Sequence, residues 1–328
     1  MKSPESPFFT VIIPTRNRPK DFKIALDSII GQSFKDIEVI AVNDGTNKEH
    51  RCAYDKLEAG SPVNVRYLNL TERSRGHGHC FARNEGVTAS SGKYICFLDD
   101  DDLWTDSEFL QRAKSEIEKM QCDLYIANQK AITHDGMEIK NVWVEDIPSL
   151  LEQSDTRFNQ SIFKIEAREL LKSRGFAHQN TCIVSRSLFD QVEGMDENMR
   201  YEPDRDIYLR LLDNANMILY DTNVVAQHNV PDKTKSTNAS TKTNKLQKLL
   251  FQLRTANKGL MFSKKHEVFL FCKQFKAHTL KHITTELLQQ NDIQKAVIYS
   301  KQALAVKFGL KWFVFTQYLK LRSLLEKK

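Results

Sequence analysis

The first 135 residues alternate short strand-like runs with helix-like periods, and this alternation constrains the fold more than any other feature. Thr10-Val11-Ile12-Ile13 is a β-branched run that ends at Pro14, and apolar residues recur at helical spacing from Phe22 to Ile30. Strands separated by helices are typical of a parallel sheet with helices on its faces. Further strands are predicted at Ile37–Val42, Val63–Leu70 and Tyr94–Leu98, with a helix at about His79–Ser90 before the last of them.

Polar residues follow three of these strands at the point where each strand ends. Pro14-Thr15 follows the first strand, Asn43-Asp44-Gly45 the second, and the run Asp99 to Asp102 the fourth. The carboxyl ends of parallel strands meet at one edge of a sheet, where open α/β sheets bind their ligands. We therefore expect three separate stretches to converge on one crevice.

Asp99, Asp100, Asp101 and Asp102 are four consecutive carboxylates, which repel one another unless a cation or hydrogen-bond donors compensate them. A solvated turn is the ordinary interpretation of such a run, but its place at the end of a buried strand favours a ligand site. Closely spaced oxygen ligands suit a hard divalent ion such as Mg²⁺ or Mn²⁺.

Beyond residue 136 the pattern is mixed. We predict a helix at Glu166–Lys172, a strand at Thr181–Val184, a helix within 204–212, a flexible loop at Pro231–Asn244, and then helices to the C-terminus. Two domains are expected: an α/β domain over residues 1–240 and a basic α-helical region over residues 241–328.

The net charge of +6 is unevenly distributed, since residues 241–328 hold 18 of the 48 basic side chains but only 4 of the 42 acidic ones. A basic tail on an acidic body suggests an anionic partner. Nucleic acid is not expected, because the tail has no recognised motif or spaced aromatic platform. Two interpretations stay open: a helix that lies in an anionic membrane interface, or a bundle that packs on the catalytic domain. Aromatic and basic residues interleave at Lys307, Phe308, Lys311, Trp312, Phe313, Phe315, Tyr318, Lys320 and Arg322.

The six cysteines lack zinc or disulfide spacing, so we expect reduced thiols. The start of the chain lacks a signal-peptide pattern, and no run of 18 apolar residues occurs. The expected location is the cytoplasm, or the cytoplasmic face of the inner membrane if the tail binds lipid.

Four motifs follow one another in the first hundred or so residues. They are Phe9 to Arg18, Val42-Asn43-Asp44-Gly45, Ala82-Arg83-Asn84-Glu85-Gly86 and Phe97 to Asp102. Their order and spacing resemble those of the family 2 glycosyltransferases, and the resemblance continues more faintly to about residue 230. It implies the GT-A fold and sugar transfer with inversion from a nucleotide-diphospho-sugar.

The resemblance also implies roles for residues along the predicted edge. Thr15 and Asp44 would line the base and ribose, and the Asp44 carboxylate could accept from a base N–H, which favours uracil or thymine. Arg83 would contact the diphosphate, with a surface ion pair to Glu85 as the alternative. Asp99 and Asp100 would face the ribose and the diphosphate, and Asp101 would bind the metal. Asp102 has no assigned role.

An inverting transfer needs a base for the acceptor hydroxyl, and the resemblance puts Asp204 in that role. Pro203 replaces the acidic neighbour usual in the family, which leaves Glu202 as a substitute. Asp204 could also cap the helix that follows it, and the two roles are compatible. His228 would ligate the metal or contact the diphosphate, or is a plain packing residue; Lys233 and Lys235 could help neutralise the diphosphate.

His77 and His79 resemble a zinc site, but they lack further ligands at zinc spacing, so a flexible loop before the Arg83 helix is preferred.

We therefore expect a glycosyltransferase that uses Mn²⁺ or Mg²⁺ and a donor such as a UDP-hexose or UDP-N-acetylhexosamine. The acceptor would be a glycan or lipid-linked glycan in bacterial surface-polysaccharide synthesis. One alternative is a sugar-nucleotide nucleotidyltransferase, which the absence of a Gly-rich segment after the first strand opposes. Another is a non-catalytic nucleotide-sugar-binding protein, favoured only by Pro203.

Overall fold

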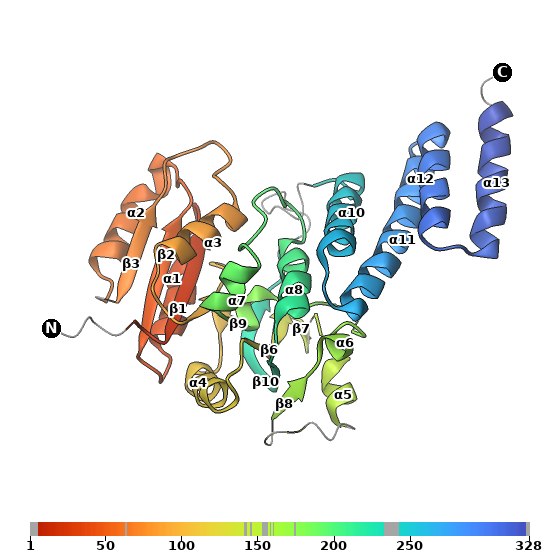
Figure 1. Ribbon diagram of the computed structural model, residues 1–328. Helices are drawn as coiled ribbons and strands as arrows, with labels where there is room; N and C mark the ends of the chain where they lie inside the picture. The colour runs from red at the N-terminus through yellow and green to blue at the C-terminus, as the bar shows by residue number, and fades with distance from the viewer. Residues whose placement is uncertain are drawn as a thin grey trace. The chain divides into compact units, whose positions relative to one another are not determined.

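The computed structural model describes residues 6–62, 64–140, 143–144, 146–152, 157, 159, 161–173, 175–232 and 243–325. They form two compact units (Figure 1). The first unit holds the sheet with helices α1 to α8, and the second holds residues 199–202 and helices α10 to α13. The predicted domain boundary at residue 240 falls outside the described residues, so it stays a prediction.

The first four strands in the sequence pair in parallel and form one half of the sheet. They lie in the order β3 (Val65–Asn69), β2 (Ile37–Asn43), β1 (Phe9–Thr15) and β4 (Tyr94–Phe97). Thr15 at the end of β1 pairs with Asn43 at the end of β2, so the polar residues that follow both strands start from the same edge.

The second half of the sheet is mixed. β9 (Cys182–Ser185) runs antiparallel between β4 and β6 (Leu124–Ile132), and β6 pairs in parallel with β10 (Ile218–Asn229). The longest ladders, β6–β10 and β1–β2, are parallel, so the predicted mostly parallel sheet is confirmed. Short antiparallel strands complete the sheet: β5 (Leu103–Trp104) and β8 (Ile162–Ile165) on β10, and β7 (Glu138–Ile139) on β6.

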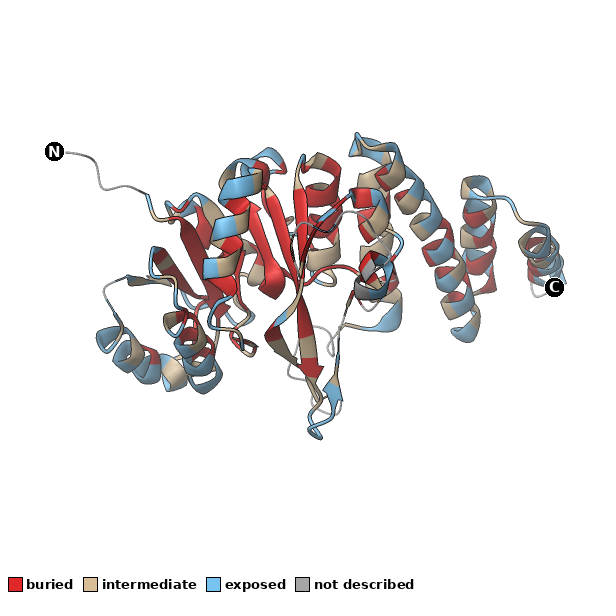
Figure 2. Cartoon of the chain, turned by 90° about the horizontal axis from the view of Figure 1, so that it is seen from below, coloured by how far each residue is buried: buried red, intermediate tan, exposed pale blue. Residues whose placement is uncertain are grey.

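Helices cover the sheet, and their burial follows their apolar periods. Their bounds are α1 (Pro19–Ile30), α2 (Lys48–Ala59), α3 (His79–Thr88), α4 (Phe109–Met120), α5 (Ile147–Glu152), α6 (Ala167–Leu170), α7 (Arg186–Gln191) and α8 (Pro203–Asn214), with a 3₁₀ turn at Gln179–Thr181. In α1, Pro19 occupies the first turn, where its missing N–H leaves no helical bond unmade. Figure 2 shows buried strands flanked by helices that are exposed on their outer sides.

The core lies on both faces of the sheet, which explains why β1 reads as a continuous apolar run. Ile12 packs into the cluster on one face, whereas Val11 and Ile13 pack into the cluster on the other. Helix α3 approaches β1 closely at Gly86, where a Cβ atom would lie 2.6 Å from Cγ2 of Ile12. A glycine is therefore needed at this position to seat α3, the helix that carries Arg83.

The alternation predicted for the first 135 residues is confirmed, with small shifts at element ends. The third strand begins at Val65, and Val63 lies outside the described residues. The predicted helix at Glu166–Lys172 shortens to Ala167–Leu170, with Glu166 as its capping residue, and the helix predicted within 204–212 extends to 203–214. Helix α2 was not predicted.

The second unit is helical, as predicted for the C-terminal region. It contains α10 (Lys245–Phe262), α11 (His266–Gln289), α12 (Ile293–Val306) and α13 (Leu310–Leu325). Leu249, Ile283, Leu287 and Ala296 form its buried cluster. None of the helices within the described ranges combines the length and apolar character needed to cross a membrane.

Candidate active site

The edge of the sheet gathers most of the predicted site residues, beginning with Thr15 at the end of β1. The Thr15 hydroxyl donates to Oδ2 of Asp100 at 2.7 Å and lies 2.6 Å from the Tyr54 hydroxyl. The carboxylate run follows β4, the parallel neighbour of β1, so strand pairing brings the two stretches together. The predicted convergence is confirmed for this pair.

Arg18 compensates two of the four carboxylates. Its guanidinium forms ion pairs with Asp100 and Asp101. Burial, together with the nearby charge of Asp101, raises the pKa of Asp100 to about 7, although Arg18 acts against this rise. Burial likewise raises the pKa of Asp101. This crowding of carboxylates supplies a reason for a cation to bind here, because one more positive charge would relieve it.

Arg83 joins Asp99 to Asp204, two residues far apart in the sequence. Its Nη2 atom lies 2.5 Å from Oδ1 of Asp99, and its Nη1 atom lies 3.5 Å from Oδ1 of Asp204. The Arg83 residue is only 2% exposed, so the alternative of a surface ion pair with Glu85 is wrong. Burial would raise the pKa of Asp99, but the charges of Arg83, His178 and His79 and the hydrogen bond from Arg83 together outweigh burial and hold that pKa well below its usual range.

His178 lies at the same place, although the sequence did not single it out. Its Nε2 atom is 3.8 Å from Oδ2 of Asp99 and 3.7 Å from Oδ2 of Asp204. It precedes the 3₁₀ turn that leads into β9, and β9 pairs with β4. The polar run His178-Gln179-Asn180 directly before a predicted strand was the available signal.

Asp102, which had no predicted role, organises the centre of the site. It is 1% exposed and accepts hydrogen bonds from Asn180, from the backbone N–H of Asn229 at 2.8 Å, and from Nδ1 of His228 at 2.8 Å if that nitrogen is protonated. Burial would lower the pKa of His228, but the bond to Asp102 and nearby carboxylates raise it above its usual value. Asn180 also accepts from the backbone N–H of Asp99 at 3.0 Å, so one amide links both ends of the carboxylate run.

Asp44 lies at the edge as predicted, but its carboxylate binds a neighbouring loop. One oxygen accepts from the His77 backbone N–H at 2.7 Å and lies 2.9 Å from His77 Nδ1, and the other accepts from the Gly78 N–H at 3.0 Å. The loop predicted to be flexible is thus anchored immediately before α3. His77 contacts the Asp44 carboxylate in the turn after β2. The described residues around His77 do not form a zinc site.

The carboxylates and imidazoles of the edge fit a divalent metal ion. Among the described residues, Asp99, Asp102 and His178 offer ligand atoms that all lie within 4.8 Å of one another. Two carboxylates and one imidazole suit Mn²⁺, and Mg²⁺ would use the oxygens. The predicted ligands Asp101 and His228 adjoin this group but are paired with Arg18 and Asp102, so their role as ligands stays a prediction.

Trp143 covers the two histidines of the site. Its ring stacks on His178 at a centroid distance of 6.0 Å and lies 5.8 Å from the ring of His228. The backbone approaches very closely here, since a Cβ atom on Gly175 would lie 1.4 Å from the Trp143 carbonyl oxygen. Only glycine fits at position 175 without moving Trp143 away from the histidines.

Asp204 lies inside the first turn of α8, which begins at Pro203. Asp204 is therefore not the N-cap of this helix, and the interpretation of it as a cap is wrong. The Asp204 side chain instead contacts Arg83 and His178. Glu202, the substitute base, belongs to the second unit, where it accepts from Gln252 at 2.9 Å. Lys233 and Lys235 lie outside the described residues.

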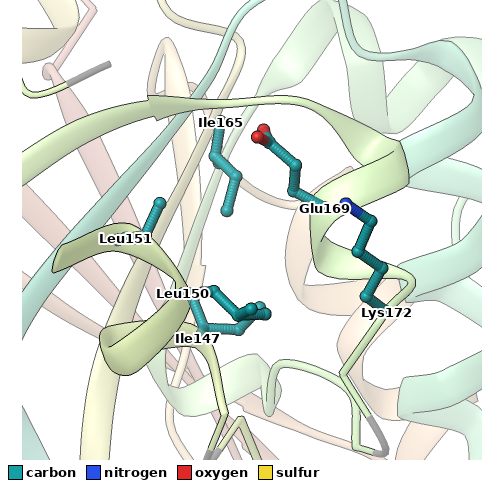
Figure 3. Close-up of a pocket in the computed structure, with 6 residues that line it drawn as sticks. All are labelled: Ile147, Leu150, Leu151, Ile165, Glu169 and Lys172. Atoms are coloured by element: carbon teal, nitrogen blue, oxygen red, sulfur yellow. The ribbon is translucent and has the colours of Figure 1, made fainter. Parts of the chain in front are cut away.

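A small pocket is lined by residues other than those of the acidic edge (Figure 3). Its lining comes from α5, β8 and α6, with Ile147, Leu150, Leu151 and Ile165 as its apolar side chains. The pocket volume is about 80 Å³. Ligand pockets are usually roughly 300–1,000 Å³, so this cavity supports no substrate assignment.

Residues 10–193, more than half of the chain, match the family model described as "Glycosyl transferase family 2". The amylovoran biosynthesis glycosyltransferase AmsB of Erwinia amylovora is 27% identical over 62% of this chain and 63% of its own. The GalNAc(5)-diNAcBac-PP-undecaprenol beta-1,3-glucosyltransferase of Campylobacter jejuni is 32% identical over 29% of this chain and 30% of its own. The chain spans less than two thirds of the length of curated relatives that it matches, with shares from 16% to 65%.

Solved structures share the fold at low sequence identity. Residues 1–349 of S. aureus TarS, in complex with UDP-GlcNAc, superpose with a TM-score of 0.66 at 17% identity, covering 97% of this chain and 91% of that one. The mannosyltransferase PcManGT from Pyrobaculum calidifontis, in complex with GDP-Man and Mn²⁺, gives a TM-score of 0.60 at 15% identity, covering 99% and 89%. The predicted GT-A fold with added C-terminal helices is thereby confirmed.

Proposed function

The chain belongs to glycosyl transferase family 2, and on this premise we propose that it transfers a sugar from a nucleotide-diphospho-sugar to a glycan or lipid-linked glycan acceptor. One observation carries the proposal. The buried guanidinium of Arg83 lies between Asp99, at the predicted donor side, and Asp204, the predicted base. The donor and the acceptor would therefore both lie beside one positively charged side chain, the guanidinium of Arg83.

The proposed donor is a UDP-hexose or UDP-N-acetylhexosamine. Thr15, Asp44, Asp99 and Asp100 would line the nucleotide, and their position at the carboxyl ends of β1, β2 and β4 supports this role. The fold alone does not choose the base, because one structural neighbour holds UDP-GlcNAc and another holds GDP-Man. The preference for uracil rests on the carboxylate of Asp44, an acceptor for a base N–H.

A divalent ion, Mn²⁺ or Mg²⁺, is part of the proposal. The residues proposed to hold it are Asp101 and His228 from the family pattern, with Asp99, Asp102 and His178 as the group that the geometry favours. When bound, such an ion stabilises the negative charge of the departing nucleotide diphosphate. Arg83 would add a fixed positive charge beside the same phosphates.

Asp204 is proposed as the base that takes the proton from the acceptor hydroxyl. Attack by that hydroxyl on the anomeric carbon, from the side opposite the leaving diphosphate, forms the new glycosidic bond with inversion. His178 and Arg83 would hold the Asp204 carboxylate in place. Pro203, the one feature that favoured a non-catalytic protein, is the first residue of α8, where proline is ordinary.

The proposed acceptor class is a lipid-linked or growing glycan in surface-polysaccharide synthesis. Support comes from the Erwinia amylovora relative, an amylovoran biosynthesis glycosyltransferase, and from the Campylobacter jejuni relative, whose name gives an undecaprenol-linked glycan. The expected location, in the cytoplasm or on the cytoplasmic face of the inner membrane, and the expected division into a transferase domain (1–240) and a helical region (241–328) are part of the proposal.

A donor screen tests the proposed function. The full chain is incubated with UDP-, dTDP- and GDP-sugars, with Mn²⁺ and with EDTA, and release of the nucleoside diphosphate is measured. We expect release from at least one UDP-sugar, and only with the metal. Absence of both release and nucleotide binding across the panel would contradict the proposal.

A further inference from the structure

Helix α13 packs one side against α12 and exposes apolar side chains on the opposite side. Thr316, Leu319 and Ser323 are buried on the inner side, where Gln294 of α12 donates to the Ser323 carbonyl at 3.2 Å. The Trp312 indole donates to the Ser300 carbonyl of α12 at 3.1 Å. This side of α13 therefore packs within the helical bundle of its own unit, whereas packing of the tail on the catalytic domain stays a prediction.

The opposite side of α13 carries an exposed apolar stripe. Leu310, Val314, Gln317, Leu321 and Leu324 follow one another at steps of four and three residues, which places them on one face of a helix. The four aliphatic side chains are between 59% and 70% exposed. Phe308, Phe313, Tyr318 and Leu325 extend the exposed apolar surface next to the stripe. An exposed apolar stripe this long indicates a surface that binds a partner.

Cations flank the stripe on both sides. On a period of 3.6 residues, Lys311 lies roughly 100° to one side of the stripe and Lys320 roughly 80° to the other. Residues 293–325, which include α12 and α13, hold six basic side chains and no carboxylate. Lysines at these positions can lay their aliphatic stems along an apolar surface and place their charges among lipid phosphates.

We propose that the exposed stripe of α13 docks in the plane of an anionic phospholipid membrane, with Leu321 near its centre and Lys311 and Lys320 at its edges. A second copy of this helix is a poorer occupant. Pairing two such helices along the stripe would bring Lys311 and Lys320 to the flanks of the contact, and neither helix offers a carboxylate to compensate them. Lipid phosphates supply that charge. Docking does not depend on the proposed chemistry, so the two are tested separately.

Vesicle flotation of the full chain tests docking. Vesicles of phosphatidylcholine alone are compared with vesicles that also contain phosphatidylglycerol, at low and high salt. We expect binding to the anionic vesicles and weaker binding at high salt, because salt screens the lysine charges. Failure to bind anionic vesicles, or equal binding to both kinds, would overturn the proposal.

Two acid substitutions of matched exposure locate the surface. Leu321→Asp changes a residue that is 64% exposed on the stripe, and Met261→Asp changes one that is 74% exposed on α10 in the same unit. We expect Leu321→Asp to reduce the bound fraction about tenfold, because a charge replaces an inserted apolar side chain, whereas Met261→Asp leaves it nearly unchanged. Equal effects would overturn the assignment to α13.

Sedimentation without lipid tests whether a second copy of the chain occupies the stripe instead of a membrane. Circular dichroism verifies that both variants keep the helical content of the parent chain. We expect a monomer whose mass Leu321→Asp does not alter. A dimer that Leu321→Asp dissociates would show that the stripe is an interface between copies of this chain, which would overturn membrane docking.

Discussion

The Nε2 atom of His178 lies 3.7 Å from Oδ2 of Asp204, although these residues come from different elements and the sequence singled out only the second. An imidazole at this distance can hold the carboxylate of the proposed base in place. We predict that His178→Gln lowers nucleotide release from the donor by about tenfold or more. His134→Gln, an exposed residue of a turn, is the control and should have no effect. Equal rates for both variants would remove His178 from the site.

Asp204→Asn should abolish turnover while it preserves donor binding. The amide keeps the size of the carboxylate, but it cannot take up the proton that the acceptor hydroxyl loses. General bases contribute about 10²–10⁴ in rate, and a loss in that range is expected. Calorimetric titration with UDP should give nearly unchanged affinity. The matched control is Asp190→Asn, an exposed position on α7. Survival of turnover in Asp204→Asn would mean that the base lies elsewhere, with Glu202→Gln as the next variant.

Arg83→Ala should destabilise the chain and weaken donor binding together. It removes the buried cation that compensates Asp99 and Asp204, and loss of one partner from a buried ion pair costs about 3–5 kcal/mol. Urea denaturation measures the change in the free energy of unfolding. The exposed Arg66 on β3 is the control, and Arg66→Ala should cost about 0.5 kcal/mol or less. Comparable losses for the two variants would contradict the bridging role.

The stability of the metal-free chain should decrease as the pH rises through the neutral range. The pKa of His228 is raised in the folded state by Asp102, so the folded chain binds this proton more tightly than the unfolded chain. That stabilisation is fully present below the ordinary pKa of histidine, about 6.5. It is lost as the pH rises through the higher folded value. Urea denaturation in EDTA across this range measures it.

His228→Gln should flatten this pH dependence, since it removes the titrating group. The control His134→Gln should leave the slope intact, because its side chain is exposed. A slope that His228→Gln does not change would assign the effect to another group, of which Asp100 is the first to examine, with its pKa raised to about 7.

Local patterns predicted the half of the site that comes from the parallel strands. Thr15, Asp44 and the carboxylate run each end a strand with a clear apolar signal, and parallel pairing fixes where such ends meet. Arg83 was found through the motif that carries it. The two partners of Arg83 were not predicted, because Arg83 reaches both Asp99 and Asp204 only when α3 and α8 pack on the sheet.

The other half depends on tertiary structure that no local period encodes. His178 and Asn180 reach the site because β9 inserts antiparallel between β4 and β6, an arrangement that strand propensity does not reveal. Trp143 comes from a stretch with no regular pattern. Asp102 was indistinguishable from its three neighbours in the sequence. Asp100 is equally buried, so the hydrogen bonds with His228 and Asn180 are what separate Asp102 from the others.

The central claim is that the carboxylate run after β4 holds the metal and the nucleotide diphosphate. Crystals grown with Mn²⁺ and UDP test it directly, since the anomalous scattering of manganese locates the ion without reference to activity. We predict a peak within coordination distance of the run Asp99 to Asp102, next to the diphosphate. A position beside Asp101 and His228 would favour the family pattern, and a position beside Asp99, Asp102 and His178 the observed group. A manganese peak elsewhere, or none beside bound UDP, would contradict the account.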